Sequence, residues 1–570
     1  MIENTLRTHI ADALKTLSIE PDSIELEFPL EVAHGDYSTN VALTHAKKVG
    51  KNPRALAEDL VVELDKNKRA DIDSIEVAGP GFINFFLSRS FFSNSLQTIS
   101  KQGEHFGRGE SRKGEKILIE YTDPNPFKQF HVGHLMSNAI GESLSRLLEF
   151  SGAEVRRANY QGDVGLHIAK AVWGMMQDAG NFPAESDSLE AKIAFLGNAY
   201  TFGAAAYEES DDAKDAILRI NKELYEKNNE QVNNLYDAGK RWSLLKFEEL
   251  YKTLGTTFDF YFFESETEKL GRTLVREYLK KGVFVESDGA IVFEADKRNP
   301  KLHTRVFITR EGVPTYEAKD LPLSQLKFDA YPFDTSIIVT AVEQREYFKV
   351  VLKALEEINP ELARKTLHVS HGMLMLPSGK MSSRKGSVVT GESLLRGAIN
   401  ESLAKMTKEY DEGVAEKIAT DVGVAAIKYS ILRQAIGKNV IYDQGKSLSF
   451  EGDSGPYLQY SAVRARSVLE KALREGIVAS GEGPKEVYQL ERLLYRFTSV
   501  VEKAEAGHAP HHVTTFLTEL ASEFNSFYAE HTIVDPSDPF SSYKVLLTEA
   551  FLEVMQNGLY ILGIRIPEKM

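Results

Sequence analysis

The sequence predicts an α/β protein with three parts: a small N-terminal α+β domain, a doubly wound parallel sheet with a helical insertion, and an all-helical C-terminal region. Three observations support this prediction. The chain has 570 residues, more than one hydrophobic core usually holds. Short apolar runs alternate with helical periodicity from about residue 111 to 400, which is typical of βαβ units. After residue 401 helical periodicity dominates to the C-terminus.

Residues 1–110 are predicted to form the α+β domain. The N-terminus is a structural helix and not a signal peptide, because apolar residues recur at helical spacing: Ile2, Leu6, Ile10, Leu14 and Leu17. Alternation and turn residues predict further elements in this order: a strand at 23–28, helices at 39–48 and 53–64, and strands at 75–77 and 82–86. The polar stretch 103–114 indicates a domain boundary.

The predicted sheet begins with the apolar run 117–121, which resembles a buried parallel strand. An amphipathic helix starts at Val132 and is closed by Gly152, and a strand at 153–160 completes a βαβ unit. The charged helical segment from about 175 to 255 is an insertion. The sheet is then expected to resume, with a helix before its last strand, through these segments: 290–293, 305–308, 336–340, 347–358 and 366–370.

Composition restricts the functional classes. The chain has no cysteine, which excludes disulfides, thiolate nucleophiles and cysteine-bound zinc and fits a reducing compartment. No run approaches the ~18 apolar residues of a membrane span. We therefore expect a soluble cytoplasmic protein with no membrane partner, no zinc and no protein-held metal. The net charge of −15 counts mildly against nucleic acid, although binding needs only a local basic patch.

The segment His131-Val132-Gly133-His134 begins the first crossover helix. A helix N-terminus favours phosphate through its unpaired N–H groups, and imidazoles one turn apart can both donate to phosphate oxygens. Gly133 leaves room for a flat base or ribose against the backbone. Composition gives roughly 0.02 chance matches to His-x-Gly-His in the chain. The alternative interpretation is a pair of surface histidines.

The segment 380–386, Lys-Met-Ser-Ser-Arg-Lys-Gly, follows the last predicted strand, at the edge of the sheet where ligands bind. Its cations, Lys380, Arg384 and Lys385, suit a departing pyrophosphate, and removing one such group typically raises the barrier by about 2.7–4 kcal/mol. The alternative is a solvated basic surface loop. Together, the two segments predict an enzyme that holds ATP and transfers its adenylyl group.

HVGH and KMSSRKG resemble the HIGH and KMSKS signatures of class I aminoacyl-tRNA synthetases. Other segments are similar to arginyl-tRNA synthetases over essentially the whole chain: HGDYSTNVAL, VAGPGFINFFL, IEYTDPNPFKQFHVGH, PTYEAKDLPL, VEQREYF, SFEGDSGPYLQYSAVRAR and GLYILGIRIPEKM. The resemblance implies an added tRNA-binding domain at 1–110, a class I Rossmann-type catalytic domain at 111–400 and a helical anticodon-binding domain at 401–570.

The same resemblance implies an arginine–tRNA ligase. Such an enzyme activates L-arginine with ATP to arginyl-adenylate, releases pyrophosphate, and transfers arginine to the 2′-hydroxyl of the 3′-terminal adenosine of tRNA(Arg). The implied cofactor set is ATP with Mg²⁺ on its phosphates and no organic cofactor. The resemblance also implies that amino acid activation requires bound tRNA. It further implies that the protein is a monomer.

Site residues follow from the resemblance position by position. The guanidinium of arginine would be held by Glu264, Tyr316 and Asp320. The amino and carboxylate end would be held by Glu120, Asn125 and Gln344. Carboxylates pair with a planar guanidinium in a fork that lysine cannot copy. Taken without the resemblance, Asp320 could cap a helix, Tyr316 could be a core residue and Glu264 a surface acid.

ATP is expected to contact these residues: His131, Gly133, His134, Glu343, Gly372, Met373, Lys380 and Lys385. In the helical region Tyr457, Tyr460, Arg464 and Arg466 are expected to bind tRNA, since aromatic and guanidinium planes stack on unpaired bases. Packing in a helical bundle is the alternative, above all for the tyrosines.

The chain departs from the family signatures at two positions. Ser383 replaces the second lysine of KMSKS, so that Arg384, Lys385 or Lys128 must supply its charge. We favour Lys128, which joins His131, His134 and Lys380 as the predicted catalytic residues. His167 stands where the family has glutamine, and its role is open.

Two rival functions are disfavoured by features of the sequence. Small nucleotidyltransferases of the pantothenate-synthetase or cytidylyltransferase kind share His-x-Gly-His, but 570 residues exceed their needs. A non-catalytic RNA-binding paralogue is disfavoured by the intact histidines, Lys380 and the acidic pocket residues.

Overall fold

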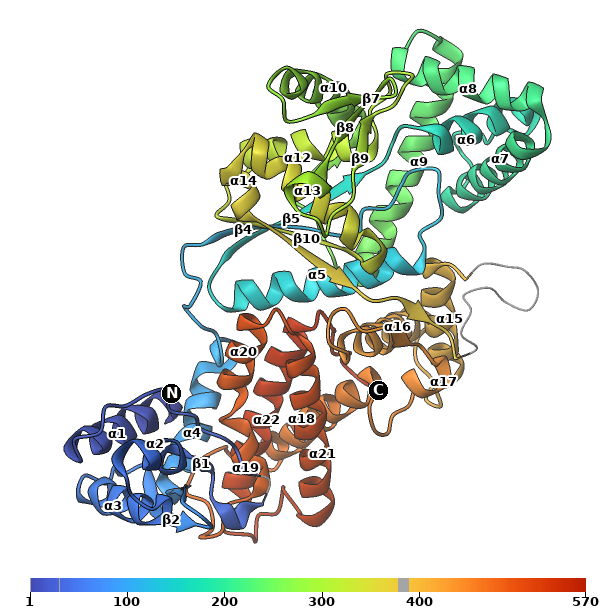
Figure 1. Cartoon of the computed structure of the whole chain (residues 1–570). Coiled ribbons are helices and arrows are strands. Elements are labelled where there is room, and N and C mark those ends of the chain that lie inside the picture. Colours follow the sequence, from blue (N-terminus) through green and yellow to red (C-terminus); the bar gives the residue numbers. More distant parts are fainter. Residues whose placement is uncertain (1, 30, 378–388) are drawn as a thin grey trace. The chain divides into compact units, whose positions relative to one another are not determined.

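A computed structural model describes residues 2–29, 31–377 and 389–570 (Figure 1). The chain forms two compact units, each made of segments that are separate in sequence. Unit 1 comprises Met1–Arg108, Tyr460–Val501 and Phe516–Gly558, and unit 2 comprises Gly109–Gln459, Glu502–Thr515 and Leu559–Met570. The functional domains expected at 1–110, 111–400 and 401–570 stay predictions, because compactness groups the chain differently.

The N-terminal part of unit 1 is an α+β structure. Its antiparallel sheet has the order β1-β3-β2, and its elements are η1 (Val32–His34), β1 (Tyr37–Thr39), β2 (Ile72–Ala78), β3 (Phe82–Leu87), α1 (Ile2–Thr16), α2 (Val41–Val49), α3 (Pro53–Lys66), α4 (Arg89–Gln102) and η2 (Gly103–His105). The predicted strand at 23–28 is wrong. Pro21 and Pro29 cannot donate to a ladder, and the segment keeps only a bridge between Glu27 and Ser38.

The C-terminal region is helical, as predicted. Its elements are α15 (Gly391–Ala404), α16 (Glu412–Leu432), α17 (Gln444–Ser447), α18 (Gly455–Arg474), α19 (Gln489–Leu494), α20 (Phe497–Ala506), α21 (His511–Glu530) and α22 (Ser541–Ile561), with the short pair β12 (Leu374–Met375) and β13 (Val440–Ile441) before and among them. In unit 1, Phe524 of α21 and Phe551 of α22 stack with centroids 3.9 Å apart. Helix packing in this unit therefore buries aromatic rings.

Unit 2 contains a five-stranded parallel sheet, which confirms the predicted α/β fold class. Its order is β11-β10-β4-β5-β6, with the strands β4 (Lys116–Glu120), β5 (Glu154–Gln161), β6 (Phe260–Phe263), β10 (Thr335–Ala341) and β11 (Thr366–His371). The chain first adds β5 and β6 on one side of β4 and later adds β10 and β11 on the other. The topology therefore switches between β4 and β10, where parallel sheets bind ligands at their carboxyl edge.

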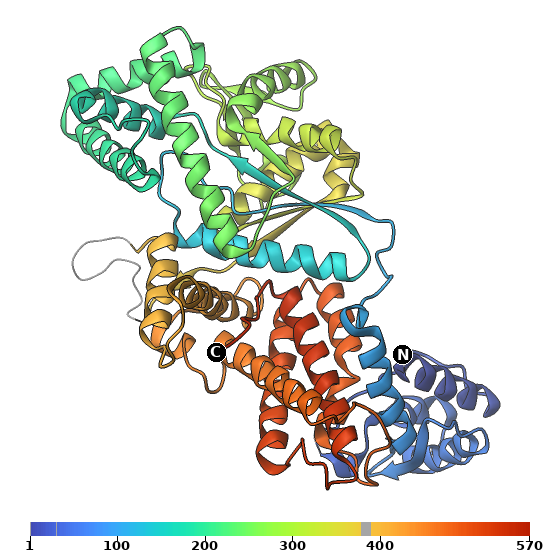
Figure 2. The same cartoon turned by 180° about the vertical axis from the view of Figure 1, so that it is seen from behind.

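Helices cover both faces of this sheet (Figures 1 and 2). Helix α5 (Val132–Phe150) lies along one face, and α12 (Tyr316–Ala330) and α13 (Arg345–Ile358) lie over the other. Leu118 belongs to the core formed with α10 (Glu264–Lys280), α12 and α13. Its neighbours Ile117 and Ile119 are also buried and point to the opposite face, because strand side chains alternate.

The segments 290–293 and 305–308 are strands, but their predicted membership of the parallel sheet is wrong. They form a separate antiparallel sheet of β7 (Val285–Ser287), β8 (Ala290–Phe293) and β9 (Arg305–Ile308). A two-residue turn joins β7 to β8, with Asp288 at φ 50° and Gly289 at φ 79°. Such a turn makes a hairpin, whereas a parallel pair needs a crossover of a dozen or more residues.

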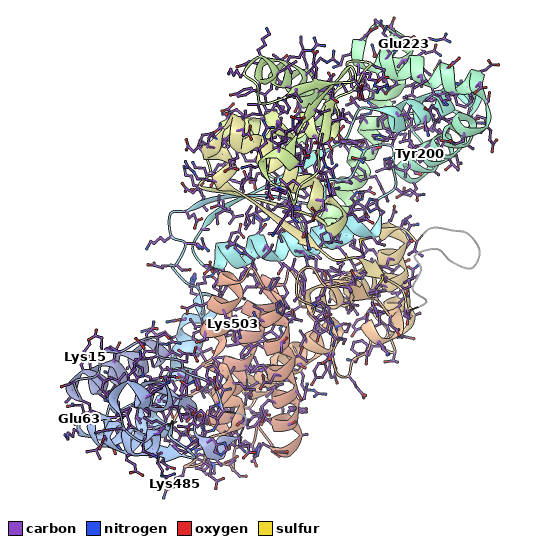
Figure 3. All side chains as sticks on the ribbon, in the orientation of Figure 1. Lys15, Glu63, Tyr200, Glu223, Lys485 and Lys503 are labelled. Atoms are coloured by element: carbon purple, nitrogen blue, oxygen red, sulfur yellow. The ribbon has the colours of Figure 1, made fainter. Side chains whose placement is uncertain are left out.

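The predicted insertion is a helical layer. The predicted range, about 175–255, contains η3 (Ala179–Asn181), α7 (Leu189–Glu209), α8 (Asp211–Glu226) and α9 (Glu230–Leu254), and α6 (Leu166–Gln177) precedes them. Tyr200 and Glu223, labelled in Figure 3, belong to α7 and α8. Apolar residues of these helices form their own core around Trp242 and Val172. Within the described ranges, no helix has both the length and the apolar character needed to cross a membrane.

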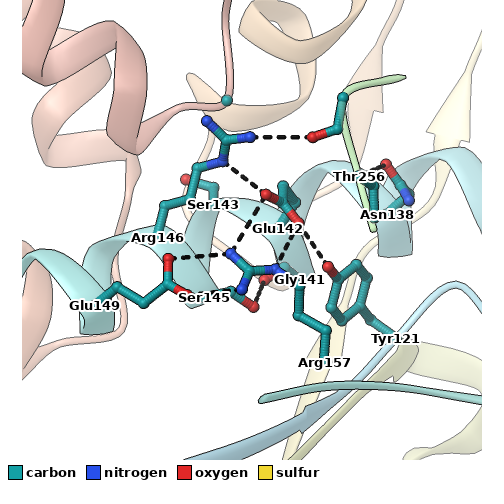
Figure 4. Close-up of polar contacts among 12 residues, drawn as sticks. Tyr121, Asn138, Gly141, Glu142, Ser143, Ser145, Arg146, Glu149, Arg157 and Thr256 are labelled. Carbon is teal, nitrogen blue, oxygen red and sulfur yellow. Dashed lines mark hydrogen bonds and ion pairs between the residues drawn. The ribbon is translucent and has the colours of Figure 1, made fainter. Parts of the chain in front are cut away.

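A cluster of buried charges fixes α5 against β4 and β5 (Figure 4). Glu142 on α5 accepts hydrogen bonds from Tyr121 (2.6 Å), Arg146 (2.6 Å) and Arg157 (3.0 Å). Arg157 also binds Glu149 at 2.7 Å. We call these five residues the Glu142 cluster. Since Tyr121 directly follows β4, the cluster fixes the start of the loop that leads to His131.

Candidate active site

A cavity of about 540 Å³ opens at the carboxyl ends of β4 and β10, at the switch point of the sheet. Many residues predicted from the sequence line it: Glu120, Asn125, His131, Gly133, His134, Glu264, Tyr316, Asp320, Glu343 and Gln344. They come from the ends of β4 and β10, the start of α5, and helices α10 and α12. The fold therefore gathers all six predicted arginine residues and four of the eight predicted ATP residues in one place.

His131 and His134 form a stacked pair at the start of α5, with ring centroids 3.5 Å apart. Nδ1 of His131 accepts from the N–H of Gly133 (3.1 Å), and Nδ1 of His134 accepts from the N–H of His131 (3.2 Å). These bonds assign the ring proton of each neutral imidazole to Nε2. Each ring can therefore donate Nε2–H to a phosphate oxygen.

Burial keeps this pair neutral. Burial and then the charge of Lys128 lower the pKa of His131, and burial, His131 and Lys128 lower the pKa of His134 well below its usual value. His134 is 8% exposed, which excludes the interpretation as two surface histidines. A Cβ on Gly133 would stand 3.0 Å from the His131 ring, so glycine also allows that ring to fold back over the helix start.

The predicted cations Lys380, Arg384 and Lys385, together with Ser383, lie outside the described residues. The segments on either side of them are described and meet the cavity. Before them, His371 at the end of β11 lines the cavity. After them, Thr390 forms a β-bridge with His131, and the N–H of Gly391 donates to Phe130 O at 2.8 Å. Two stretches far apart in sequence thus converge beside the imidazole pair.

Two carboxylates of the cavity have lysine partners. Lys319 donates to Glu264 at 2.8 Å, and both residues are almost fully buried. Burial still raises the pKa of Glu264, because the opposing effect of Lys319 is smaller. Lys327 forms an ion pair with Glu120, with Nζ and Oε2 2.5 Å apart. Glu264 is therefore not a surface acid, which was the alternative considered from the sequence.

Asp320 has no lysine partner among the described contacts. Its Oδ2 accepts a hydrogen bond from the Tyr347 hydroxyl at 2.6 Å. Burial, together with the charges of Glu120 and Glu264, raises the pKa of Asp320 to about 7. Asp320 lies inside α12, whose N-cap is Thr315, and so it does not cap the helix. A cationic ligand would relieve this carboxylate.

The loop after β4 is held in an unusual backbone conformation. Thr122, Asp123 and Phe127 have φ values of 79°, 49° and 65°. Backbone strain of this kind persists where surrounding contacts impose it, and such sites are often functional. Here Asp123 accepts from the N–H of Tyr160 at 2.8 Å, and Asn125 accepts from the N–H of Gly162 at 3.1 Å.

Gly162 is required for this arrangement. A Cβ there would stand 2.5 Å from Oδ1 of Asn125 and 2.9 Å from Oε1 of Glu264. The next residue, Asp163, is fully buried and accepts from Tyr236, Lys240 and Ser265. The 162–165 turn therefore brings an amide and a carboxylate together beside the cavity.

Other predicted residues lie at the cavity walls or outside them. Tyr316 is 56% exposed, which excludes a core role, and Glu343 and Gln344 form η4 (Val342–Gln344) after β10. Gly372 and Met373 do not line the cavity. Gly372 packs against the backbone of Lys438, and the N–H of Met373 donates to the Asn439 side chain at 2.9 Å.

Lys128 lines a neighbouring cavity of about 300 Å³ between the 128–130 segment, α7 and α9. Burial is the main cause that lowers its pKa, while Glu264 raises it. His167 bonds Gly162 O through Nε2 at 3.1 Å, and burial lowers its pKa to about 3. His167 thus supports the Gly162 turn in the neutral form.

The residues predicted to bind tRNA all belong to α18: Tyr457, Tyr460, Arg464 and Arg466. Arg464 donates to Asn525 and, at 3.1 Å, to the Tyr460 hydroxyl. Its guanidinium is also 4.9 Å from the centre of the Tyr528 ring. Arg464 is therefore engaged within unit 1, and the RNA-binding role of these four residues stays a prediction.

Sequence reasoning missed several residues of the cavity and its support. They include these polar residues: Asp123, Lys319, Lys327, Tyr347 and His371. Asp123, Lys319 and Tyr347 stand inside segments already singled out for their similarity to the family, beside residues that were assigned. Lys327 follows Asp320 by two helical turns, and this spacing on one helix face was the available signal.

Comparison with known proteins identifies the family. Three family models match: "tRNA synthetases class I (R), catalytic domain" over residues 95–444, "Arginyl tRNA synthetase N terminal domain" over 4–87, and "DALR anticodon binding domain" over 458–570. Two similar relatives are named arginine–tRNA ligase. That of Treponema denticola is 30% identical over 100% of both chains, and that of Treponema pallidum is 31% identical over 97% of this chain and 96% of its own.

A solved structure supports the fold. Thermus thermophilus arginyl-tRNA synthetase matches with a TM-score of 0.79 and 24% identity, and the match covers 100% of both chains. The three matched regions follow one another in the order of the predicted parts. The chain therefore belongs to the arginyl-tRNA synthetase family of class I aminoacyl-tRNA synthetases.

Proposed function

We propose that this chain is an arginine–tRNA ligase that works in two steps in the cavity of unit 2. First, the arginine carboxylate attacks the α-phosphorus of ATP and pyrophosphate leaves. Second, the 2′-hydroxyl of the terminal adenosine of tRNA(Arg) attacks the arginyl carbonyl and AMP leaves. Neither step needs a covalent enzyme intermediate, so that catalysis rests on positioning and electrostatics.

One observation carries this proposal: the same cavity contains two imidazoles that can donate hydrogen bonds to phosphate and a group of carboxylates that can bind a cation. His131 and His134 offer Nε2–H groups at the N-terminus of α5, whose dipole favours anions. Glu264 and Asp320 lie in the same cavity, and Tyr347 orients Asp320. A molecule with a guanidinium at one end and a carboxylate directed at a triphosphate suits this polarity.

The finer roles are proposals of the same kind. Glu264, Tyr316 and Asp320 bind the guanidinium. The amino acid end of arginine is held by Glu120, Asn125 and Gln344. A polar site of this kind rejects amino acids that lack the guanidinium fork by about 10⁴-fold or more.

For ATP, the imidazole pair binds phosphates, Glu343 approaches the ribose, and Gly372 and Met373 border the adenine. Mg²⁺ enters as part of the ATP substrate, bound to its phosphates. Lys380 and Lys385 lie outside the described residues, and we propose that they and Lys128 neutralise the leaving pyrophosphate. Tyr457, Tyr460, Arg464 and Arg466 contact tRNA. The enzyme acts as a cytoplasmic monomer, without zinc or an organic cofactor.

The test is aminoacylation of bulk tRNA with each of the twenty amino acids, with ATP and Mg²⁺. We expect arginine alone to be attached to tRNA. ATP–pyrophosphate exchange, measured with and without tRNA, should require tRNA. Attachment of another amino acid would remove the assignment of the carboxylates, and exchange without any RNA transfer would favour a small-molecule nucleotidyltransferase.

A further inference from the structure

The ammonium group of Lys327 lies behind the cavity. Its Nζ is 2.5 Å from Oε2 of Glu120, and the two residues are 1% and 3% exposed. Lys327 follows Asp320 by two turns on α12, so both side chains project from the same side of the helix. Glu120 and Asp320 line the cavity but Lys327 does not. The lysine therefore contacts a substrate-facing carboxylate from behind.

Three carboxylates interact with Lys327: Glu120 at the end of β4, Asp123 in the following loop and Asp320 on α12. Asp320 also interacts with groups from other elements, which are Tyr160 on β5, Glu264 on α10 and Tyr347 on α13. Burial is the main cause that raises the pKa of Asp123 and Asp320, and the charge of Lys327 acts against it at both.

The other buried lysine of α12 has a different partner. Lys319, which directly precedes Asp320 in the sequence, donates a hydrogen bond to Glu264 at 2.8 Å. Within the described part of the chain, Lys327 is thus the cation that Glu120, Asp123 and Asp320 share. Buried carboxylates at close range resist ionisation together, and a common counter-ion favours their charged forms.

We propose that Lys327 is a positioning residue for the arginine substrate and acts through Glu120. It binds Oε2 of Glu120, which leaves Oε1 and the carboxylate charge to receive the α-amino group of arginine. This inference rests on the proposed function, since it assumes that arginine occupies the cavity. It goes further than that function, because it proposes that a residue outside the cavity controls the charge and orientation of a carboxylate inside it.

A purely structural role makes different predictions. Breaking a buried ion pair leaves an uncompensated charge and destabilises the fold, whatever occupies the cavity. A structural lysine would therefore change stability without changing how arginine binding depends on pH. A positioning lysine changes the Michaelis constant for arginine, its pH profile and its coupling to Glu120.

The experiment measures aminoacylation by the full-length chain between pH 6 and 9 for wild type, Lys327→Met, Glu120→Gln and the double variant. Methionine keeps the length and packing of the lysine stem without the charge. At pH 7 we expect Lys327→Met to raise KM for arginine about tenfold, equivalent to about one pKa unit, with little change in KM for ATP. The difference in KM for arginine between this variant and wild type should narrow towards pH 9, because Asp320, whose pKa burial raises to about 7, is then largely ionised even without the lysine.

Coupling supplies a second readout. If Lys327 acts through Glu120, adding Lys327→Met to Glu120→Gln should raise KM for arginine by less than about twofold further. Lys327→Arg, which keeps the charge, should retain the wild-type pH profile. Lys327→Arg is therefore the variant to examine if Lys327→Met does not fold. If its pH profile of KM for arginine were shifted like that of Glu120→Gln, the proposal would be contradicted.

Lys365→Met is the matched control. Lys365 is a partly buried lysine of the same unit that donates to Phe333 O at 3.2 Å, and it does not line the cavity. Its removal should leave the pH profile unchanged. A Lys327→Met enzyme with a wild-type profile, or fully additive effects of the two substitutions, would overturn the proposal. Wild-type enzyme that attaches no arginine would instead contradict the proposed function.

Discussion

Unit 2 buries two groups of carboxylates with opposite electrostatic character. In the Glu142 cluster, the combined charges of Arg157 and Arg146, with the Tyr121 hydroxyl, outweigh burial and lower the pKa of Glu142. In the cavity, burial prevails and raises the pKa of Asp320 and Glu264. All three are carboxylates removed from bulk solvent, and Glu142 has two arginine partners whereas Glu264 has one lysine and Asp320 has a tyrosine, so the number of fixed cationic partners separates the two groups.

The two groups of carboxylates therefore differ in role: the Glu142 cluster stabilises the fold, whereas the cavity carboxylates are available to a ligand. Glu142 has every partner it needs inside the protein, and its cluster connects α5 to β4 and β5. Asp320 is bonded to a single tyrosine and faces a cavity. An acid whose charge is left undercompensated at a cavity is poised for a cationic ligand. Substitutions in the two groups should therefore change different measurable properties.

The largest effect is expected at Asp320. Asp320→Ala removes the carboxylate proposed to pair with guanidinium, so that kcat/KM for arginine should fall about 10³-fold, or about 4 kcal/mol. Steady-state aminoacylation measures it. Asp329→Ala is the control, because Asp329 is an exposed acid of the same helix, bonded to Gln325 at 2.8 Å. Near-normal kinetics in Asp320→Ala would show that the guanidinium binds elsewhere.

Glu142→Gln should act on stability. The substitution leaves Arg146 and Arg157 without their main anion, and breaking a buried pair typically costs about 3–5 kcal/mol. Urea unfolding of unit 2 should shift to lower denaturant, while the folded enzyme keeps its KM for arginine. Glu149→Gln should shift it less, because Glu149 is 26% exposed. If Glu142→Gln raised KM for arginine without lowering stability, the Glu142 cluster would have a functional and not a structural role.

Gly391→Ala tests the contact between the start of α15 and the Phe130–His131 segment. A Cβ there would stand 2.8 Å from His131 O and 3.0 Å from the Phe130 ring, so the backbone must separate. We expect KM for ATP to rise about tenfold, equivalent to about 1.4 kcal/mol. Gly397→Ala on the same helix is the control, since its Cβ would make only an ordinary contact with Gln444. Equal effects of both changes would argue against a specific role for this junction.

The smallest effect is the pH dependence of the wild-type enzyme. Since the pKa of Asp320 is raised from 3.8 to about 7, its anionic form is lost as pH falls through 7. KM for arginine should then rise about fivefold from pH 7 to pH 6. For stability the sign is opposite: a raised carboxyl pKa stabilises the fold below about pH 4, and that contribution is lost as pH rises through 7. Asp320→Asn should remove both dependences.

Much of the fold could be predicted because its signals are local. The apolar run 117–121 and the helix from Val132 were recognisable from periodicity, and both elements lie within a residue or two of the predicted bounds. The strands at 290–293 and 305–308 were also recognised, but not their partners. Pairing depends on which edge lies nearby, and a hairpin turn at Asp288 decided it.

The candidate site shows the same limit. The sequence marked His131, His134, Glu264 and Asp320 by residue type and family resemblance, and these residues line one cavity. Their chemical states could not be predicted, because each depends on a partner from another element. The Lys327–Glu120 pair, the Tyr347 bond to Asp320 and the backbone donors that set the imidazole tautomers are all of this kind.

The sequence alone therefore determined most of the elements, their order and the residues predicted to bind phosphate and a guanidinium, since these follow from local spacing, side-chain chemistry and family resemblance. Tertiary structure decided which carboxylates are neutralised and which face the cavity, because charge compensation depends on distances between residues far apart in the chain. It also decided that Thr390 meets His131. That contact joins two stretches that no local pattern relates.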